Sequence, residues 1–508
     1  MTPSVEDAGR RDRFEILRRE VERKMLKPLR IHNWTAKIER EINQGEYVIV
    51  TAERAGVSHR VGVLYTGSTA NAVYKQVAAQ VEHIFVNGGV YRDDSFTRGV
   101  GRPVESLDAF PNLLLHWNAT TSKGKFAPNA QKTSSDPVTR RPYRMLLSEQ
   151  PIESIWLRLR QLQSVTLARK LIEDKARREE ISLEVAVLKT KADGVAYALR
   201  NARDYYQASE HRNVSQRVLN LYYGSLSFAF AEILAAPTGP RSLGELENTT
   251  KQGHGLYTLD SESLGLEELI VGIISNGFFP AWMKALGMDT TRLPQKKPRL
   301  YRDLTNMADA PWTTVERLFA RIPEIADLFA DIFDSPAAWV EPSGDMEANF
   351  PQGPTKGPRT RTYIQLIDEF GRLGPKEIAE FPGPISEITE VDAKGDGRHF
   401  RVAIDHQGHQ HPWEVLDLHH SPFKRSSLLM PVLGGLKEYR ALCVVILYAL
   451  SIVVRYRPSL WRRVQEGDLD HLRVLIEAFL VVVERVLPEQ FLETISGQRI
   501  YAKQPGTF

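Results

Sequence analysis

The chain has almost no cysteine: Cys443 is the only one in 508 residues. No intramolecular disulfide can form, which fits a reducing compartment. The longest apolar run, residues 441–454, is too short to span a bilayer and is typical of a buried helix. The charged N-terminus lacks the apolar segment of a signal peptide. These absences predict a cytoplasmic protein with no membrane segment.

Catalytic motifs are equally scarce. The sequence contains no Gly-x-Ser-x-Gly elbow, no Cys-x-x-Cys pair and no His-Glu-x-x-His helix. It also lacks the lysine-containing loop of P-loop proteins and the glycine spacing of a dinucleotide fingerprint. These residues do not decide whether the protein is an enzyme. They also indicate no cofactor.

Size and charge are ordinary overall but unevenly distributed. Hydrophobic residues make up 42% of the chain and charged residues 25%, as in soluble globular proteins, and 508 residues suffice for two or three domains. The net charge is +3, with +7 in residues 1–148 and −4 in the remainder. A surface that attracts anions is therefore expected in the N-terminal part.

Helical periodicity dominates the chain after residue 150. In residues 196–234 apolar side chains follow a 3.6-residue period over two helices, and Ser215 is expected to cap the second helix. We predict a mainly α fold: a helical bundle core with a small β insertion, preceded by a small α+β N-terminal domain. The expected boundaries are 1–118 for that domain, 119–150 for a basic linker, 151–500 for the helical domain and about 385–418 for the insertion.

The N-terminal domain is predicted from one strand pair. Residues 47–52 and 59–65 are rich in β-branched residues and flank a turn at residues 54–56, which is typical of a β-hairpin. Residues 34–42 are expected to form a short helix before the hairpin, and residues 70–85 a longer helix after it. In the β insertion, strands are expected at residues 385–391, 399–404 and 413–418.

Several short segments carry a family resemblance. They are WLRLRQLQSVTLAR (156–169), DYYQA (204–208), LYYG (221–224), QGHGL (252–256), LFARIPEI (318–325) and ILYALSIVVRYRPSLW (446–461). Through them, residues 151–490 resemble the bacterial YaaC-like family. The family has no established activity that could be assigned to this chain. The resemblance therefore implies a family but no reaction.

One candidate anion site lies in the N-terminal domain. Ser68 and Thr69 stand between a predicted strand and a predicted helix, where backbone N–H groups attract phosphate or carboxylate. Three basic residues are close by in the sequence: Arg54, His59 and Arg60. The alternative, which is preferred, is that Ser68 and Thr69 only cap the helix.

A basic loop offers a second surface for anions. It contains Lys123, Lys125, Arg140, Arg141 and Arg144 and could hold nucleic acid through its phosphates. It has few aromatic residues for base stacking, so a solvated linker is the preferred interpretation.

His254 is the best catalytic candidate, with Lys251 close to it in sequence. Gly253 and Gly255 flank the histidine, which would let a ligand approach the backbone, and histidine can act as an acid or a base. The alternative is a tight turn with a hydrogen-bonded histidine.

Five of the 13 histidines fall within 15 residues, at His406, His409, His411, His419 and His420. Their spacing could bring imidazoles to one metal ion. We prefer an exposed turn between strands for the first of them, and predict no metal site.

Helical ribonucleases of the HEPN class pair an arginine with a histidine four to six residues away. Here Arg203 and His211, and Arg463 and His471, are too far apart, whereas Arg54–His59 and Arg401–His406 fall on predicted strands or turns. The arginine–histidine spacing on the predicted helices therefore does not match that of the HEPN class.

Three functions remain open. The leading expectation is a module that binds a macromolecular partner, nucleic acid or protein, through its N-terminal domain, and the sequence is compatible with an oligomer. One alternative is a nucleic-acid-directed enzyme, a ribonuclease-like helical domain that uses His254 or an arginine–histidine pair of the bundle. The other is a sensor of a small anion or nucleotide at Ser68 and Thr69. A role in phage defence is an analogy that suits the first two.

Overall fold

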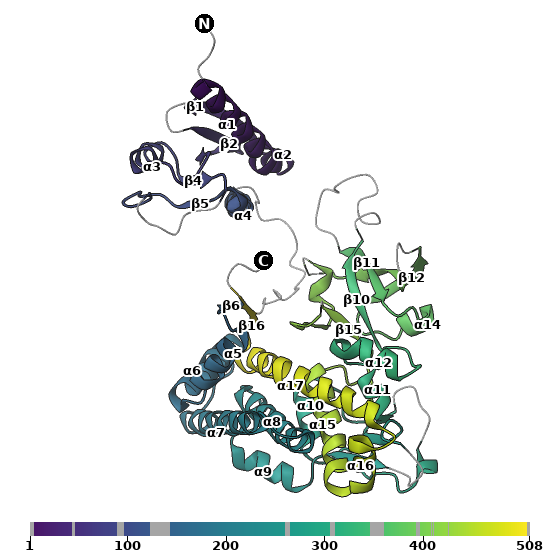
Figure 1. The fold of residues 1–508 in the computed structure, drawn as a ribbon. Helices are drawn as coiled ribbons and strands as arrows, with labels where there is room; N and C mark the ends of the chain where they lie inside the picture. Colours follow the sequence, from purple (N-terminus) through teal and green to yellow (C-terminus); the bar gives the residue numbers. More distant parts are fainter. Residues whose placement is uncertain are drawn as a thin grey trace, which may run out of the picture. The chain divides into compact units, whose positions relative to one another are not determined.

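The computed structural model describes residues 5–42, 46–88, 96–121, 143–259, 265–304, 310–345, 360–392, 397–407, 409, 411–424 and 426–504. It divides the chain into two compact units, residues 1–134 (unit 1) and residues 135–508 (unit 2) (Figure 1). Most of the predicted basic linker lies outside the described residues, and so do four candidate residues: Lys123, Lys125, Arg140 and Arg141.

Unit 1 is built on a mixed five-stranded sheet in the order β1-β2-β3-β4-β5. Strands β1 to β3 pair antiparallel, and β3 to β5 pair parallel. The elements in chain order are α1 (Val5–Val21), the π-helical η1 (Glu22–Leu26), α2 (Lys27–Ile31), β1 (Thr35–Ile42), β2 (Tyr47–Arg54), β3 (Val57–Leu64), α3 (Asn71–Ala78), β4 (His83–Val86), β5 (Val104–Ser106), the 3-10 turn η2 (Leu107–Ala109) and α4 (Phe110–Thr121).

Both faces of this sheet are buried, which explains the nearly continuous apolar run of β2. Val48 and Val50 belong to an apolar cluster with residues of α1 and α4. Tyr47 and Ile49, which alternate with them, belong to a second cluster with residues of α3. A strand covered on both sides needs apolar residues at every position.

The predicted hairpin is present as β2 and β3. The predicted helix at residues 34–42 is wrong: Ala36 and Ile38 alternate with exposed neighbours, and the segment forms β1. The predicted 70–85 helix is too long, because α3 ends at Ala78 and the buried residues Ile84, Phe85 and Val86 form β4.

Unit 2 contains more helix than strand. The longest helices are α7 (Val185–Ser209), α8 (Val214–Ala235), α15 (Tyr439–Tyr456) and α17 (Asp470–Ser496), and α8 packs against the other three. The remaining helices are α5 (Pro151–Gln161), α6 (Val165–Arg178), α9 (Leu243–Lys251), α10 (Phe278–Ala285), η4 (Tyr301–Asp303), α11 (Val315–Phe319), η5 (Pro323–Ile325), α12 (Ala326–Ile332), α14 (Pro375–Ile378), η6 (Pro412–Glu414) and α16 (Pro458–Glu466).

The expected helix pair at residues 196–234 is α7 and α8, but its cap differs from the prediction. Asn213 is the N-cap of α8, and its Oδ1 accepts a hydrogen bond from the backbone N–H of Gln216 at 2.9 Å. Ser215 lies inside the helix, where its Oγ accepts a hydrogen bond from Trp461 Nε1 at 2.8 Å. Ser215 therefore ties α8 to α16 instead of capping its own helix.

The strands of unit 2 form three sheets. A six-stranded antiparallel sheet has the order β12-β13-β11-β10-β15-β14, a three-stranded one has the order β7-β8-β9, and β6 and β16 form a parallel pair beside α5 (Figure 1). The strands are β6 (Tyr143–Leu147), β7 (Leu256–Leu259), β8 (Ile270–Ile273), β9 (Trp312–Thr314), β10 (Trp339–Gly344), β11 (Arg361–Asp368), β12 (Ile385–Val391), β13 (Arg398–Asp405), β14 (Leu418–His419), β15 (Ser427–Leu429) and β16 (Arg499–Lys503).

The predicted β insertion is present but larger than residues 385–418. The strands expected at 385–391 and 399–404 are β12 and β13. The strand expected at 413–418 is wrong, because its first residues belong to the 3-10 turn η6 and only Leu418 joins β14.

Two described helices, α8 and α15, are long and apolar enough to cross a membrane by length and composition alone. In each, 78% of the apolar window is buried inside the protein. Both lie in the core cluster of unit 2, so their apolar surface is covered by other helices.

Candidate functional site

Unit 2 contains a polar cavity of about 670 Å³ at the C-terminal end of α17. Its walls come from α6, α8, α15, α17 and the segment that contains β14, which are far apart in sequence. Five basic, five acidic and two histidine side chains line it: Lys175, Arg178, Lys437, Arg440, Arg499, Glu179, Glu232, Asp417, Glu438, Glu493, His419 and His420. We call this the α17 cavity and treat it as the candidate functional site.

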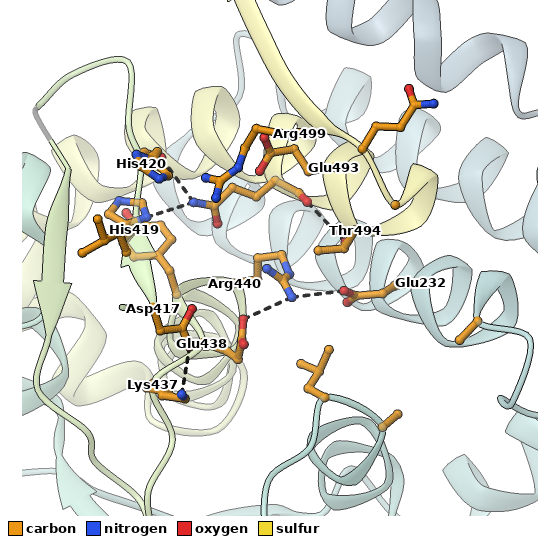
Figure 2. A pocket seen from close by; sticks show the side chains of 18 of the residues that line it. Glu232, Asp417, His419, His420, Lys437, Glu438, Arg440, Glu493, Thr494 and Arg499 are labelled. Atoms are coloured by element: carbon orange, nitrogen blue, oxygen red, sulfur yellow. Dashed lines mark hydrogen bonds and ion pairs between the residues drawn. The ribbon is translucent and has the colours of Figure 1, made fainter. Parts of the chain in front are cut away.

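Arg440 is a buried cation of the α17 cavity, as is Lys175. It is the second residue of α15 and only 8% exposed. Its Nη2 lies 3.1 Å from Glu232 Oε1 on α8 and 3.2 Å from Glu438 Oε2, the residue before α15 (Figure 2). Its Nε–H is buried and has no acceptor among the described residues. Buried donors normally have an acceptor, so this guanidinium is only partly satisfied.

Carboxyl groups from three elements converge on Arg440. Burial raises the pKa of Glu438, partly offset by the charge of Arg440. Burial also raises the pKa of Glu493, although the backbone N–H of Ile500 donates to its Oε1 at 2.7 Å. Glu232 is oriented by Trp282, whose Nε1–H donates to Oε2 at 2.9 Å. These carboxyl oxygens are held in fixed positions as hydrogen-bond acceptors.

His419 and Gln490 form a second polar group in the wall. The His419 ring stacks on Tyr439 with centroids 3.7 Å apart, and its Nε2 lies 2.7 Å from Glu324 Oε1. Gln490 Nε2 lies 2.9 Å from His419 Nδ1, so Nδ1 accepts and Nε2–H donates to the buried carboxylate. Gln490 Oε1 is buried without a donor among the described residues. The cavity wall thus contains one unmatched donor, Arg440 Nε, and one unmatched acceptor.

Two cations of the cavity bind the C-terminal end of α17. Lys175 Nζ donates to the carbonyl oxygens of Thr494 and Ile495 at 3.2 and 3.3 Å, and Arg178 Nη2 to that of Ser496 at 3.5 Å. These are the last carbonyls of α17, which have no partner within the helix. The two side chains therefore close the helix end, where the macrodipole also favours cations.

The five clustered histidines do not gather in one place. His419 and His420 lie at the α17 cavity, whereas His406 follows β13 and its Nε2 lies 2.7 Å from Thr362 Oγ1. His406 is only 1% exposed, so the interpretation as an exposed turn is wrong for it. In the described parts of the chain, no group of three or more His, Cys, Asp or Glu side chains could hold a metal ion.

The basic candidates of unit 1 have protein partners. Arg60 Nη2 lies 2.8 Å from Glu39 Oε1, and His59 Nδ1 lies 2.8 Å from Glu82 Oε2. Arg54 Nη1 donates to Asn118 Oδ1 at 2.8 Å, and its guanidinium lies over the Trp34 ring. His59 also stacks on the Trp117 ring, with centroids 4.3 Å apart. These side chains therefore connect strands and helices of unit 1 to one another.

Ser68 and Thr69 do not cap α3. The N-cap of α3 is Ala70, which has no side-chain cap. Thr69 Oγ1 donates to the Thr66 carbonyl at 2.8 Å, and Ser68 Oγ lies 3.1 Å from Thr66 Oγ1. Both hydroxyls close the loop on itself, so the preferred cap interpretation is wrong. Arg144, the described member of the predicted basic loop, is exposed on β6.

His254 lies among two tyrosines and one arginine. Its Nδ1 is 3.1 Å from Tyr222 Oη, and its ring centroid is 6.1 Å from that of Tyr448. Burial, and then the charge of Arg455, lower the pKa of His254. Lys251 is exposed at the end of α9, where its Nζ lies 3.5 Å from Asn248 Oδ1. The structure thus surrounds His254 with residues that sequence spacing did not connect to it.

In three of the four arginine–histidine pairs considered from sequence, the arginine binds another residue. Arg463 binds Asp468 at 2.6 Å, and Arg401 binds Asp345 at 2.6 Å. Arg54 and His59 contact different partners, as described above.

Sequence reasoning missed the α17 cavity, although one signal was present. Glu232 stands alone in the apolar segment FAFAEILAA, and Arg440 directly precedes the apolar run of α15. A single charged residue in a buried helix requires a partner, and these two are partners of each other.

Fold and site together define a mainly helical domain that encloses a charged cavity and carries additional β-sheets. The chain belongs to the YaaC-like family: residues 160–495 match the family described as YaaC-like Protein. The match includes Glu232, Glu438, Arg440 and Glu493, whereas unit 1 lies outside it. No curated protein and no solved structure matches the chain.

Proposed function

We propose that unit 2, whose long helices we take to form one bundle, binds a small polar molecule in the α17 cavity. The observation that carries the proposal is the α17 cavity itself, which has a volume of about 670 Å³ and is lined by the guanidinium of Arg440 between Glu232 and Glu438. A cavity of this volume is in the size range of small-molecule sites.

The charges of the lining narrow the ligand class. Five basic and five acidic side chains balance, so a molecule of large net charge of either sign is disfavoured. The lining offers a ligand both donors, such as the Arg440 guanidinium, and acceptors, such as the carboxyl oxygens of Glu438 and Glu493, so a ligand with both kinds of group fits it. Neutral or zwitterionic molecules, such as nucleosides, carboxamides or amino acids, have that pattern.

This proposal moves the expected ligand site from Ser68 and Thr69 to unit 2. Binding of a macromolecular partner through unit 1 stays a prediction, as does a role in phage defence. Its support is reduced because Arg60 and His59 each already pair with a carboxylate.

The test uses the full-length protein in two steps. Material purified under native conditions is denatured, and released small molecules are identified by mass spectrometry. The same protein is then titrated with nucleosides, carboxamides and amino acids while its melting temperature is measured. We expect a released compound, or a member of the panel, to raise the melting temperature.

The Glu438→Gln variant separates cavity binding from binding elsewhere. It keeps the size of the side chain but removes the carboxylate beside Arg440, so we expect at least a tenfold loss of affinity, or about 1.4 kcal/mol. Glu247→Gln, an exposed position on α9, is the matched control and should bind as the unmodified protein does. Equal affinity in both variants, or no ligand from either step, would refute the proposal.

A further inference from the structure

A second polar surface of unit 2 shares no residue with the α17 cavity. It consists of Tyr205 on α7, Tyr223 on α8, and Arg455 and Tyr456 at the end of α15, with His254 next to it. The rings of Tyr205 and Tyr223 are stacked with centroids 5.7 Å apart, and Arg455 Nη1 donates to Tyr223 Oη at 3.3 Å. The Arg455 guanidinium also lies over the Tyr456 ring, 5.1 Å from its centroid. We call this set the tyrosine–arginine surface.

Two of the rings on this surface are open to solvent. Tyr205 is 38% exposed and Tyr456 66% exposed. Gly224 of α8 lies close to Cβ of Tyr205 on α7, and Tyr456 is the last residue of α15. Both exposed rings are linked to Arg455, Tyr205 through the stacked ring of Tyr223 and Tyr456 directly.

No carboxylate among the described residues pairs with Arg455. Its guanidinium donates to the Ser451 carbonyl at 3.1 Å, to Ser451 Oγ at 3.3 Å and to Tyr223 Oη. Asp204 is exposed next to Tyr205 in sequence, but adjacent residues point about 100° apart around a helix. An anion can therefore serve as the partner of this guanidinium.

We propose that the tyrosine–arginine surface binds single-stranded nucleic acid. Two exposed rings linked to one cation offer stacking positions for two bases and a contact for the phosphate between them. Bases stack on tyrosine with little regard to sequence, and an arginine contributes a phosphate contact and cation–π attraction. A duplex keeps its bases stacked inside and would not offer them to Tyr205 and Tyr456.

His254 extends the same surface toward a phosphate. Burial raises the pKa of Tyr222 above its ordinary value, so its hydroxyl keeps its proton and can donate to His254 Nδ1. The ring proton of a neutral His254 then lies on Nε2, where it can donate to a phosphate oxygen. In this role His254 is a binding residue.

The experiment measures fluorescence anisotropy of short poly-U and poly-dT strands with the full-length protein over a salt series. Tyr205→Ala and Tyr456→Ala change exposed rings, and each should raise Kd at least about fivefold, the lower limit for loss of one stacked base. Arg455→Met should weaken binding and reduce the slope of log K against log salt by about 0.7, the contribution of one phosphate contact to a single strand.

Matched controls lie elsewhere on unit 2. Tyr301→Ala removes a ring that is 44% exposed, and Arg292→Met removes an exposed arginine; both should leave Kd unchanged. AMP and inorganic polyphosphate serve as competitors for a free nucleotide and for charge alone. Both should compete much more weakly than an unlabelled strand.

Four results would overturn the proposal. They are no binding of either strand, unchanged Kd in both tyrosine variants, equal competition by polyphosphate, and full displacement by AMP at concentrations that match the strand. The second result would leave the basic loop of residues 120–144 as the source of any strand binding. None of them bears on the α17 cavity, whose test uses other residues and other ligands.

Discussion

At the scale of single residues, some charged side chains are buried, and their contribution to the free energy of unfolding therefore depends on pH. Arg440 is the clearest case because its two ion-pair partners differ in environment. Glu232 is fixed by Trp282, whereas Glu438 has a pKa that burial has already raised.

Replacement of Arg440 by methionine should therefore destabilise unit 2 by about 3–5 kcal/mol at neutral pH, the usual effect of leaving a buried charge without its partner. Without Arg440 the folded-state pKa of Glu438 rises further above its unfolded value. A raised folded pKa gives stability below the unfolded pKa that is lost as pH rises through the folded pKa. The loss of unfolding free energy in Arg440→Met should thus be smaller at about pH 5 than at about pH 8. Urea denaturation of both proteins at the two pH values measures this difference. An equal deficit at both would contradict this account.

Lys191 is an independent test, because burial lowers the pKa of this cation whereas it raises the pKa of Glu438. It is fully buried in α7, and its Nζ donates to the carbonyl oxygens of Gly239 and Pro240 at 3.0 and 2.8 Å. Burial lowers its pKa from 10.5 to about 8. Between these two values the unfolded chain binds the proton and the folded chain does not, so stability from Lys191 rises with pH.

We therefore expect the difference in unfolding free energy between the unmodified protein and Lys191→Met to increase from about pH 8 to pH 10.5. The increase should be at most about 3 kcal/mol, from 1.36 kcal/mol per pKa unit. Lys189→Met, two residues away and exposed, is the control and should give a flat difference curve. A flat curve for Lys191→Met as well would show that its amine titrates normally.

At the scale of elements, α7 and α8 approach each other closely at Gly224. A Cβ atom on Gly224 would lie 2.7 Å from Cδ2 of Tyr206, a buried ring that is hydrogen-bonded to Ser225 at 3.1 Å and cannot easily move. Gly224→Ala should lower the unfolding free energy by about 1–3 kcal/mol, as overpacking does.

Gly244→Ala is the matched control for that substitution. It also replaces a helical glycine, but the nearest atom, Ser242 Oγ, is 3.8 Å from the added Cβ. Since alanine has the higher helix propensity by about 1 kcal/mol, this variant should be as stable as the unmodified protein or slightly more stable. Thermal denaturation monitored by circular dichroism distinguishes the two outcomes, and similar effects of both substitutions would refute the packing argument.

The elements also show what the sequence could reveal. The β2–β3 hairpin was predictable from its β-branched residues and the turn between them, and the α7–α8 pair from apolar residues that repeat at the helical period. Strand β1 was not, because it is a largely exposed edge strand whose register shifts between Ile38 and Arg40. The α17 cavity could not be predicted, because Lys175, Glu232, Arg440 and Glu493 come from four different helices. Only the isolated charges in the apolar segments of α8 and α15 indicated it.

At the scale of the whole molecule, the two units have separate apolar cores. The clusters of unit 1 contain residues between Phe14 and Trp117, and the cluster of unit 2 contains residues between Leu146 and Ile500. In the described chain no buried core residue is shared between them. Since burial of apolar surface is the main source of stability, each unit has its own source of folding free energy.

Calorimetry of the full-length protein should therefore resolve two unfolding transitions, because two cores without shared residues do not have to unfold together. The larger enthalpy belongs to unit 2, which has more residues to unfold. Gly224→Ala should lower only the transition of unit 2, by a few degrees, and leave the other in place. A substitution in the core of unit 1, Val50→Ala, should do the reverse. If either substitution shifts both transitions equally, or if one cooperative transition is seen in all three proteins, the two units unfold as one. A ligand of the α17 cavity should then stabilise unit 1 as well.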